Sequence, residues 1–567
     1  MERLARLRTV KRPPPRRNPR ALAVTAVAAV VVTGLIAFAN AECLELVVAS
    51  SNEKSQLLAD IAKTYPAPQV DRRCVTVKII EKASGAAERA LRRDWAEEGL
   101  RTPHVWSPAA TTWLVLLAQH RSDDGRTDIV EGVAHSLMQS PLAIAMPESM
   151  ANALPNPSKI GWQDIYDLAR KGWGSYGKPW GPFRLGKTDP TTSTSGLHAL
   201  ISVNYAAQRT SDPDEFVRIV EQSVVHYGDT VRTVLRNLRA ADDLNAAPTY
   251  VSAIAVEEKQ VFDYNNPATG RPPREKLKAI HPTDGTLVAD HPYAILTWTD
   301  AAHKQAAADF EEYLSGPTIQ ARFQAAGFRN YLGQAGAVLE SPYFDKSGPK
   351  GIWKPPDPKD LVEMLRAWRH DLRKPAHALF VVDVGRSMSE LATGTKITKL
   401  DLATRAASVA LDDLAPKDDV GLWTFPTTDG TLYRVAAPTS TVATSTSALA
   451  RALPPVGTSG DEKGLYGVIR ASVDEVRATY DRDRINAVVV LTGGGYPLTD
   501  KTAANGLIDY LLRQPLDQQI PIYVIAYGTT SKDVLQNIAE SSGGAFYDAT
   551  TDQVNIGEQL RNAMSNF

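Results

Sequence analysis

Cysteine, histidine and net charge are all scarce in this chain. Its 567 residues include 2 cysteines and 10 histidines, and the formal net charge is −1. The histidines show no metal-ligand spacing, which argues against a histidine metal centre. A balanced charge without a basic patch argues against a nucleic-acid partner. Internal repeats and long low-complexity tracts are also missing, and a chain of this length is expected to form about two to four domains.

Patterns typical of catalytic sites are equally scarce. No Ser/His/Asp order, paired carboxylates or metal ligands support a hydrolase that acts on cell-wall material. Gly181–Thr188 (GPFRLGKT) fits the phosphate-binding pattern Gly-x4-Gly-Lys-Thr, but turn-like residues precede it and Asp189-Pro190 follows where a helix should begin. Ser51–Lys54 fits the Ser-x-x-Lys motif of penicillin-binding enzymes without its companion motifs, so we predict only a helix start there. The sequence therefore predicts a protein that is not an enzyme.

One long apolar run lies near the N-terminus. Residues 1–20 carry eight Lys or Arg and one acidic residue, and Ala21–Ala39 is an uncharged apolar segment of 19 residues. At ~1.5 Å per residue, such a helix is about as long as a bilayer core is thick. The basic flank predicts a cytoplasmic N-terminus and an extracellular remainder. Ala39-Asn40-Ala41 fits the small-x-small rule for a cleaved signal, but the length of the run favours an uncleaved anchor over residues 21–41.

The two cysteines, Cys43 and Cys74, follow directly after this segment. In an exported chain, a lone pair of cysteines most simply forms a disulfide. Closing a loop of this size contributes ~3 kcal/mol by chain entropy. The alternative of two unpaired buried thiols is disfavoured in an oxidising compartment, so we predict a disulfide between Cys43 and Cys74.

A second apolar run, in the C-terminal third, ends in an acidic residue. Ala376–Ser389 (AHALFVVDVGRSMS) is apolar up to Asp383, and Gly385 and Ser387 follow at two-residue spacing. This pattern is typical of a buried central strand that ends at the carboxyl edge of a parallel α/β sheet. Leu400–Leu414 has helical apolar spacing. Three further strands complete a predicted doubly wound sheet, at Val420–Phe425, Ala487–Thr492 and Ile520–Tyr527.

The segment around Asp383 resembles the first metal loop of von Willebrand factor A (VWA) domains, which reads Asp-x-Ser-x-Ser. In that family the Asp and both Ser hydroxyls hold a divalent cation, usually magnesium. Here Gly385 replaces the first Ser, Gly493 replaces the acid of the third loop, and Lys463 falls on the ligand Thr of the second loop. The resemblance implies a doubly wound, Rossmann-like VWA domain that engages a protein partner, with Asp383 and Ser387 as its remaining metal ligands.

The loss of ligands changes what this edge is expected to bind. A divalent ion with two protein ligands and one carboxylate would bind weakly. Lys463 offers another solution, because an ammonium group pointing at Asp383 would supply the charge that the metal normally provides. The alternative is that Lys463 is an ordinary solvated loop lysine. We assign no cofactor firmly and keep Mg²⁺ as the candidate ion at Asp383 and Ser387.

The region between the anchor and the C-terminal third has a different pattern. Leu44–Ala49 and Cys74–Ile80 are predicted strands with a helical stretch between them, and Val105–Pro108 follows a third strand. This start resembles the two-lobed extracellular solute-binding proteins of bacterial transport systems, closest to those that bind molybdate, sulfate and phosphate. Three later segments add to the resemblance: Thr188–Gly196, Val251–Asn265 and Asp290–Tyr293. It implies a type II periplasmic-binding-protein-like α/β domain with a ligand cleft between its lobes.

Hydroxyl side chains occur where this resemblance places the ligand. Four of them immediately precede the helical segment Gly196–Ala207, where hydroxyls and backbone N–H groups at a helix N-terminus form an oxyanion site. Others precede the first helix or complete the wall of the cleft. The alternative is that they are helix N-caps only. The candidate residues for a small-molecule or anionic ligand are Ser50, Ser51, Ser107, Thr192, Ser193, Thr194, Ser195 and Tyr250.

The predicted architecture has five parts. They are a basic cytoplasmic tail (1–20), a transmembrane helix (21–41), a solute-binding-like domain (42–344), a linker with a connecting helix at Lys359–Arg373 (345–375) and a VWA domain (376–567). This order resembles actinobacterial membrane proteins that join the two modules. The resemblance implies a binding or adhesion protein displayed on the bacterial surface and tethered to the membrane. A substrate-binding receptor of a transport system is the first alternative, and a cell-envelope hydrolase is the second.

Overall fold

The computed structural model describes residues 43–567, except 97–99, 157–158, 394, 445–461, 495–497, 529–530 and 551–555. The tail at 1–20 and the membrane segment predicted at 21–41 lie outside this part of the chain. Within it, no helix combines the length and the apolar character needed to span a bilayer. The anchor therefore stays a prediction.

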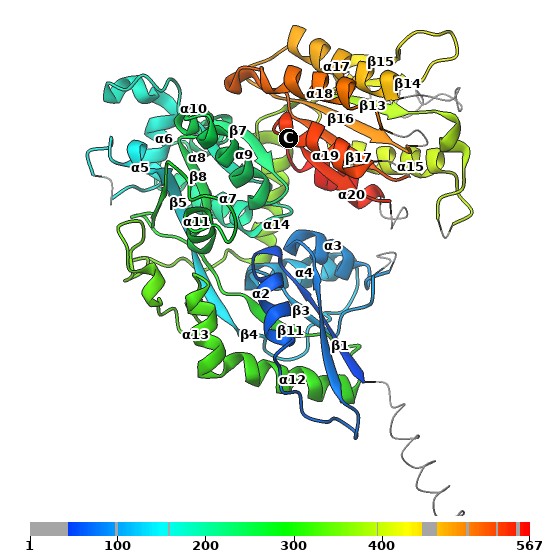
Figure 1. Ribbon diagram of the computed structural model, residues 1–567. Helices are drawn as coiled ribbons and strands as arrows, with labels where there is room; N and C mark the ends of the chain where they lie inside the picture. The colour runs from blue at the N-terminus through cyan, green and yellow to red at the C-terminus, as the bar shows by residue number, and fades with distance from the viewer. Residues whose placement is uncertain are drawn as a thin grey trace, which may run out of the picture.

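The first lobe is built on a five-stranded sheet with the order β2-β1-β3-β11-β4. Its strands are β1 (Leu44–Ser50), β2 (Val75–Glu81), β3 (Val105–Ser107), β4 (His135–Ser136) and β11 (Pro292–Ile295). The helices of this lobe are α2 (Asn52–Ala62), α3 (Ser84–Arg92), α4 (Thr111–Asp123), α12 (Ala301–Ser315) and α13 (Pro317–Ala325). Strands β1, β2 and β3 are parallel, and β11 runs antiparallel to β3. In Figure 1 this lobe lies at the bottom, in blue and green.

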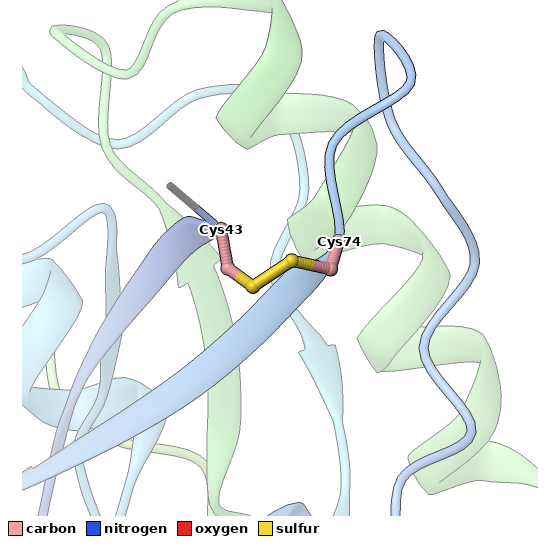
Figure 2. The surroundings of a disulfide bond; sticks show 2 residues. All are labelled: Cys43 and Cys74. Carbon is pink, nitrogen blue, oxygen red and sulfur yellow. A yellow bond between two sulfur atoms is a disulfide. The ribbon is translucent and has the colours of Figure 1, made fainter. Parts of the chain in front are cut away.

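The predicted disulfide is confirmed and lies at the start of the first sheet. Cys43 and Cys74 are bonded, with their Cα atoms 4.6 Å apart, within the usual range for such bonds (Figure 2). The backbone N–H of Leu44 donates to the carbonyl of Cys74 over 2.7 Å, so the parallel pairing of β1 and β2 begins directly beside the bond.

The second lobe contains a seven-stranded sheet with the order β10-β5-β8-β6-β7, in which β9 and β12 also pair with β5. Its strands are β5 (Met138–Pro147), β6 (Leu185–Thr188), β7 (Val224–Gly228), β8 (Ala253–Glu257), β9 (Leu277–Ile280), β10 (Val288–Ala289) and β12 (Arg329–Asn330). The helices are α5 (Glu148–Ala151), α6 (Trp162–Lys171), α7 (Thr194–Ala207), α8 (Pro213–Gln222), α9 (Val231–Asp243), α10 (Ala247–Tyr250) and α11 (Glu258–Asn265). The chain enters this lobe between β4 and β5, leaves it between β10 and β11, and returns to it between α13 and β12. These three connections are where a hinge between the lobes would bend.

The C-terminal domain holds a six-stranded sheet with the order β15-β14-β13-β16-β17-β18. Its strands are β13 (Ala376–Asp383), β14 (Asp419–Phe425), β15 (Arg434–Thr441), β16 (Ile485–Thr492), β17 (Ile522–Ala526) and β18 (Ala545–Asp548), with β15 as an antiparallel edge on an otherwise parallel sheet. The helices are α15 (Lys399–Asp412), α17 (Glu462–Ala478), α18 (Lys501–Leu512), α19 (Lys532–Ser541) and α20 (Ile556–Met564). Asp383 ends β13, between β14 and β16, where the strand order reverses.

Both faces of this sheet are apolar, as expected for buried parallel strands. Leu379 and Val381 pack with α17, α18 and α19 on one face. Phe380 and Val382 belong to a different core cluster, which includes residues of α15 and α20 and continues into the two lobes. The sheet therefore has helices on both sides. Membership of the VWA family stays a prediction.

The predicted linker lies against the second lobe. Trp353 donates its backbone N–H to the carbonyl of Thr286 over 2.8 Å, and its ring covers Gly285. Gly285 has φ +122°, and a Cβ there would lie 2.4 Å from the ring, so only glycine fits. The predicted helix Lys359–Arg373 divides into α14 (Pro358–Ala367) and a π-helical turn, η3 (Trp368–Leu372). The domain boundaries themselves stay predictions.

Candidate functional site

The candidate site is a cavity of about 610 Å³ between the two lobes, which we call the cleft cavity. This volume suits a small organic molecule. The first lobe contributes Asn52, Glu53, Ala83 and Ser84 to its wall. The second lobe contributes residues from three places: the segment Thr192–Ser195, the start of α9 with Asp229, and the junction of β8 and α11 with Glu257.

The two lobes touch at the rim of the cleft cavity. The backbone N–H of Gly85 donates to the carbonyl of Thr192 over 3.0 Å, and Arg89 donates to the carbonyl of Thr191 over 3.0 Å. A Cβ on Gly85 would lie 2.1 Å from the oxygen of Thr191, so this approach of two backbones requires glycine. The structure therefore shows the lobes in a closed arrangement.

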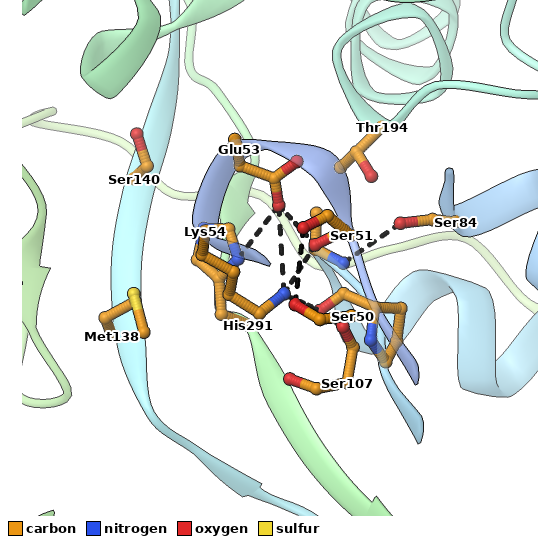
Figure 3. A network of polar contacts seen from close by, with 12 residues as sticks. Ser50, Ser51, Glu53, Lys54, Ser84, Ser107, Met138, Ser140, Thr194 and His291 are labelled. Atoms are coloured by element: carbon orange, nitrogen blue, oxygen red, sulfur yellow. Dashed lines mark hydrogen bonds and ion pairs between the residues drawn. The ribbon is translucent and has the colours of Figure 1, made fainter. Parts of the chain in front are cut away.

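A buried lysine organises the first-lobe wall (Figure 3). The Nζ of Lys54 donates to the Oγ of Ser51 over 2.5 Å and to the carbonyls of Ser107 and Pro108 over 2.9 and 3.0 Å. Burial lowers the pKa of Lys54 to about 8, and the carboxylates of Glu53 and Asp290 oppose this shift. The lysine thus ties the start of α2 to the end of β3.

Glu53 occupies the N-terminus of α2, where the sequence predicted an anion site. Its Oε1 accepts a hydrogen bond from the Oγ of Ser51 and lies 3.8 Å from the Nζ of Lys54. The Nδ1 of the buried His291 lies 3.4 Å from the same oxygen. Burial lowers the pKa of His291 well below its usual range, so that ring is neutral. The carboxylate of the protein itself thus takes the position that a bound anion would need.

The hydroxyls predicted on this side do not line the cleft cavity. Ser50, Ser51 and Ser107 are almost fully buried. The Oγ of Ser50 contacts the carbonyl of Ser51 at 3.3 Å, and that of Ser107 donates to the carbonyl of Pro292 over 2.8 Å. Because Ser51 is shielded by Glu53, the Ser-x-x-Lys pattern forms a structural contact rather than an exposed nucleophile. A ligand-binding role for these three residues stays a prediction.

The second-lobe hydroxyls do line the cleft cavity, but most of them contact protein atoms. Helix α7 begins two residues earlier than predicted, at Thr194, so Thr194 and Ser195 form its first turn and Ser193 its N-cap. Thr194 accepts a hydrogen bond from the indole of Trp113 over 2.7 Å, and Ser195 donates to Glu257. The Oγ1 of Thr192 lies 3.0 Å from the Oγ of Ser565 in the C-terminal domain. All four residues predicted from the sequence thus line the cavity, but the hydroxyls of three of them contact protein atoms.

Tyr250 lies elsewhere. Its hydroxyl contacts the Nε2 of His226, and it lines a separate cavity of about 370 Å³ between the second lobe and the C-terminal domain. Burial raises the pKa of Tyr250 above its usual range, so the hydroxyl stays protonated. The predicted role of Tyr250 in the cleft wall is not supported by this position.

Glu257 is the residue that sequence reasoning missed. It ends β8, and its Oε2 accepts the hydrogen bond from Ser195. Its Oε1 is buried and has no hydrogen-bond partner among the described residues. Burial raises the pKa of Glu257 to about 7, and the nearby carboxylate of Glu53 adds to the shift. An apolar strand that ends in an acid, the pattern that singled out Asp383, was the available signal.

The phosphate-binding pattern at Gly181–Thr188 has a structural explanation. Its last four residues form β6, and Lys187 is buried in an ion pair with Glu221. A lysine held in this way is not available to a phosphate, in agreement with the prediction that this segment is not a phosphate-binding loop.

The edge of the C-terminal sheet is internally bonded. Asp383 accepts hydrogen bonds from the N–H of Gly385 over 2.8 Å and from the Oγ1 of Thr492 over 3.1 Å. Ser387 donates to the carbonyl of Gly494 over 2.7 Å. Among the described residues, no group of three or more His, Cys, Asp or Glu side chains could hold a metal ion.

Two side chains occupy the space around Gly493, where VWA domains carry an acid. A Cβ on Gly493 would lie 2.4 Å from the Sδ of Met388 and 3.8 Å from the Cδ of Lys399. Lys399 is buried and pairs with Glu390 over 2.7 Å. The side chain of Lys463, our predicted counter-ion, lies outside the described part of the structure. Both the magnesium site and the Lys463 counter-ion stay predictions.

Comparison with known proteins identifies the family of the two-lobed region. Residues 46–329 match the family described as bacterial extracellular solute-binding protein. No curated protein matches the chain. Similar solved structures include the sulfate-binding protein SubI from Mycobacterium tuberculosis H37Rv, with 13% identity, a TM-score of 0.38, and coverage of 57% of this chain and 96% of that one.

Two further structures are similar to the same extent. A periplasmic thiamin binding protein has 12% identity and a TM-score of 0.41 over 57% of this chain and 93% of that one. The periplasmic binding protein AfuA from Actinobacillus pleuropneumoniae has 13% identity and a TM-score of 0.39 over 57% and 97%. Similarity this distant says nothing about the ligand of this chain. The family match spans half of the chain, and this protein therefore belongs to the family of bacterial extracellular solute-binding proteins.

Proposed function

We propose that this chain is a membrane-tethered extracellular receptor whose cleft cavity binds a small solute without transforming it. We propose further that solute binding is linked to the docking of a VWA-like C-terminal domain. Membership of the solute-binding family supports the receptor role. The link to the C-terminal domain rests on one observation: residues that line the cleft cavity are bonded directly to that domain.

Three such contacts join the cavity wall to the C-terminal domain. The Oγ1 of Thr192 lies 3.0 Å from the Oγ of Ser565, and the N–H of Asp229 donates to the Oδ1 of Asn566 over 3.3 Å. Arg236 donates to the carbonyl of Gly544. A change in the position of this wall would therefore alter its contacts with the C-terminal domain.

Arg89 extends the connection to the first lobe. Its Nη2 pairs with the Oε1 of Glu558 in α20 over 2.7 Å, while its Nη1 holds the carbonyl of Thr191. The side chain of Glu558 is 6% exposed, and the arginine lowers the pKa of this carboxyl against the effect of burial. Opening the cleft at its hinge would break at least one of these two contacts. A solute that favours the closed lobes should thus also favour the docked C-terminal domain.

Within this proposal, delivery of the solute to a transport system has more support than adhesion, because the family match covers the solute-binding region alone. Adhesion is the second candidate function. It is favoured by the C-terminal sheet, in which Asp383 lies at the carboxyl edge where the strand order reverses, a usual place for a binding site. A protein partner would bind at that edge.

Hydrogen exchange on the full chain tests the link between the cleft and the C-terminal domain. A solute that raises the melting temperature should slow amide exchange in both α3 and α20. Arg89→Ala should speed exchange in α20, whereas Arg93→Ala, an exposed arginine just after α3, should not. A solute that binds the cleft but leaves α20 unchanged would disprove the link, and failure of a broad solute panel to bind would count against the receptor function.

A further inference from the structure

The charged side chains around the cleft cavity are not equally available to a ligand. The cavity is lined by four carboxylates and three arginines, and every arginine has an acidic or carbonyl partner of its own. These residues are Glu53, Asp229, Glu257, Asp263, Arg232, Arg236 and Arg239. The question is which of them still has capacity for a ligand.

The arginines on α9 are balanced by groups outside the cavity. Arg236 bonds to the carbonyl of Gly544 and lies 3.5 Å from Glu540, both in the C-terminal domain. Arg239 donates to the carbonyl of Arg271 over 2.9 Å. Some N–H groups of Arg236 and Arg239 remain unbonded, but their charges face acids behind the wall. Arg232 is largely exposed and lies 3.4 Å from Glu81.

Two of the four carboxylates are also engaged by the second lobe itself. Asp229 accepts hydrogen bonds from the N–H of Thr230 and the hydroxyl of Thr233, each over 2.8 Å. Asp263 pairs with Lys259 on the preceding turn of α11. These contacts leave Glu53 and Glu257 as the acids with capacity for a ligand.

Glu257 and Glu53 approach the cavity from opposite lobes. Only one oxygen of Glu257 is hydrogen-bonded, and the other is buried at the wall of the cavity without a partner among the described residues. Leaving a buried carboxylate oxygen unpaired is costly, and a second carboxylate facing the same space adds repulsion. A positively charged N–H donor placed between them would remove both costs.

The apolar residues of the cavity wall indicate which kind of cation fits. Ala83, Val231 and Leu235 line the same cavity and offer apolar contacts. The described residues contain no cluster suited to a metal ion. A bare metal ion would leave the apolar surface uncovered, whereas an alkyl chain would cover it.

We propose that the cleft cavity binds an organic ammonium ion, whose N–H groups donate to Glu257 and Glu53 and whose alkyl portion contacts Ala83, Val231 and Leu235. This inference rests on the proposed receptor function and specifies the solute class. It replaces the anionic ligand that the sequence suggested, because the N-terminus of α2 holds Glu53 and the hydroxyls at the N-terminus of α7 are largely engaged. The raised pKa of Glu257 agrees with a carboxylate that lacks its counter-charge.

Calorimetry on the full chain in detergent tests this inference, with butylamine and 1,4-diaminobutane as cationic probes and sulfate and molybdate as anionic probes. We expect an amine to bind and Glu257→Gln to weaken that binding by at least about tenfold, because the charge-assisted hydrogen bond is lost. Glu53→Gln should weaken binding less, since Lys54 partly balances its charge. Glu215→Gln, an exposed change on α8 outside the cavity, is the control and should have little effect.

The stability of the unliganded variants separates loss of binding from loss of folding. Glu257→Gln should melt at the same temperature as the parent or higher, because it removes a poorly solvated carboxylate and keeps an acceptor for Ser195. Amine binding that survives in Glu257→Gln, or no amine binding at 10 mM, would overturn the inference. Tight sulfate or molybdate binding would overturn the solute class and still support the receptor function. If neither probe class binds and a broader panel also fails, both proposals fail.

Discussion

Glu221 in α8 is a single buried carboxylate that joins the second lobe to η3, the turn that precedes the C-terminal domain. It pairs with Lys187 of β6 and accepts hydrogen bonds from the hydroxyl of Tyr227 over 2.7 Å and the indole of Trp368 over 3.0 Å. All four side chains are at most 2% exposed. Burial and the adjacent carboxylate raise the pKa of Tyr227 well above its usual range, so its hydroxyl remains a donor.

The contribution of the Lys187–Glu221 pair to the free energy of unfolding can be estimated by removing one partner at a time. Glu221→Gln places an amide against the buried ammonium of Lys187, and an unpaired buried charge typically costs about 3–5 kcal/mol. Lys187→Met leaves the carboxylate without its cation and should cost a similar amount, about 3 kcal/mol or more. The double variant removes both charges and keeps an acceptor for Tyr227 and Trp368. It should be more stable than either single variant, with a coupling energy of at least about 2 kcal/mol.

Urea unfolding of the full chain, followed by tryptophan fluorescence, measures these free energies. Glu215→Gln, an exposed change on the same helix, is the control and should stay within about 0.5 kcal/mol of the parent. A double variant destabilised by the sum of the two single costs would show that Lys187 and Glu221 do not depend on each other, and would refute the reasoning.

Three further results are expected. Gly85→Ala should open the cleft, because its Cβ would lie 2.1 Å from the oxygen of Thr191; small-angle scattering should show a larger radius of gyration, and an unchanged radius would contradict this. Between pH 4.5 and pH 7 the native state holds a proton on Glu257 that the unfolded chain has lost, because burial raises the pKa from 4.5 to about 7. Stability should therefore fall as pH rises across this window, by up to about 3 kcal/mol, and this part of the slope should vanish in Glu257→Gln; identical slopes in the two proteins would rule the shift out. Gly493→Asp alone should not create a magnesium site, since Met388 fills the space, so micromolar binding by calorimetry in that single variant would show this packing argument to be wrong.

The sequence predicted much of the fold because buried strands leave a strong local pattern. The apolar run that ends at Asp383 is β13, and the predicted strands Val420–Phe425 and Ala487–Thr492 differ from β14 and β16 only at their first residues. Helix ends were less predictable. The hydroxyl residues Thr192–Ser195 immediately precede Gly196, and each of them could serve as the N-cap, so the sequence did not reveal that Ser193 is the cap and that Thr194 and Ser195 lie inside α7.

The site was predicted less well, for a physical reason. Hydroxyls near a helix N-terminus suggested an anion, but the sequence does not reveal that Glu53 folds back onto Ser51. Nor does it reveal that Glu257 lines the same cavity as Glu53 of the first lobe, since the two acids are about two hundred positions apart in the sequence and only the tertiary structure brings them near each other. Local pattern identified which elements carry the site, while the pairing of charges across the cleft depends on tertiary structure.

The bond between Cys43 and Cys74 has a mechanical consequence. If the segment before Cys43 is the anchor that we predict, any force applied through the tether enters the first lobe at this bond. Because the bond links the starts of two parallel strands, the load is shared between β1 and β2 and acts along both of them, rather than peeling one strand from the edge of the sheet. Reduction would leave β1 to carry the pull alone.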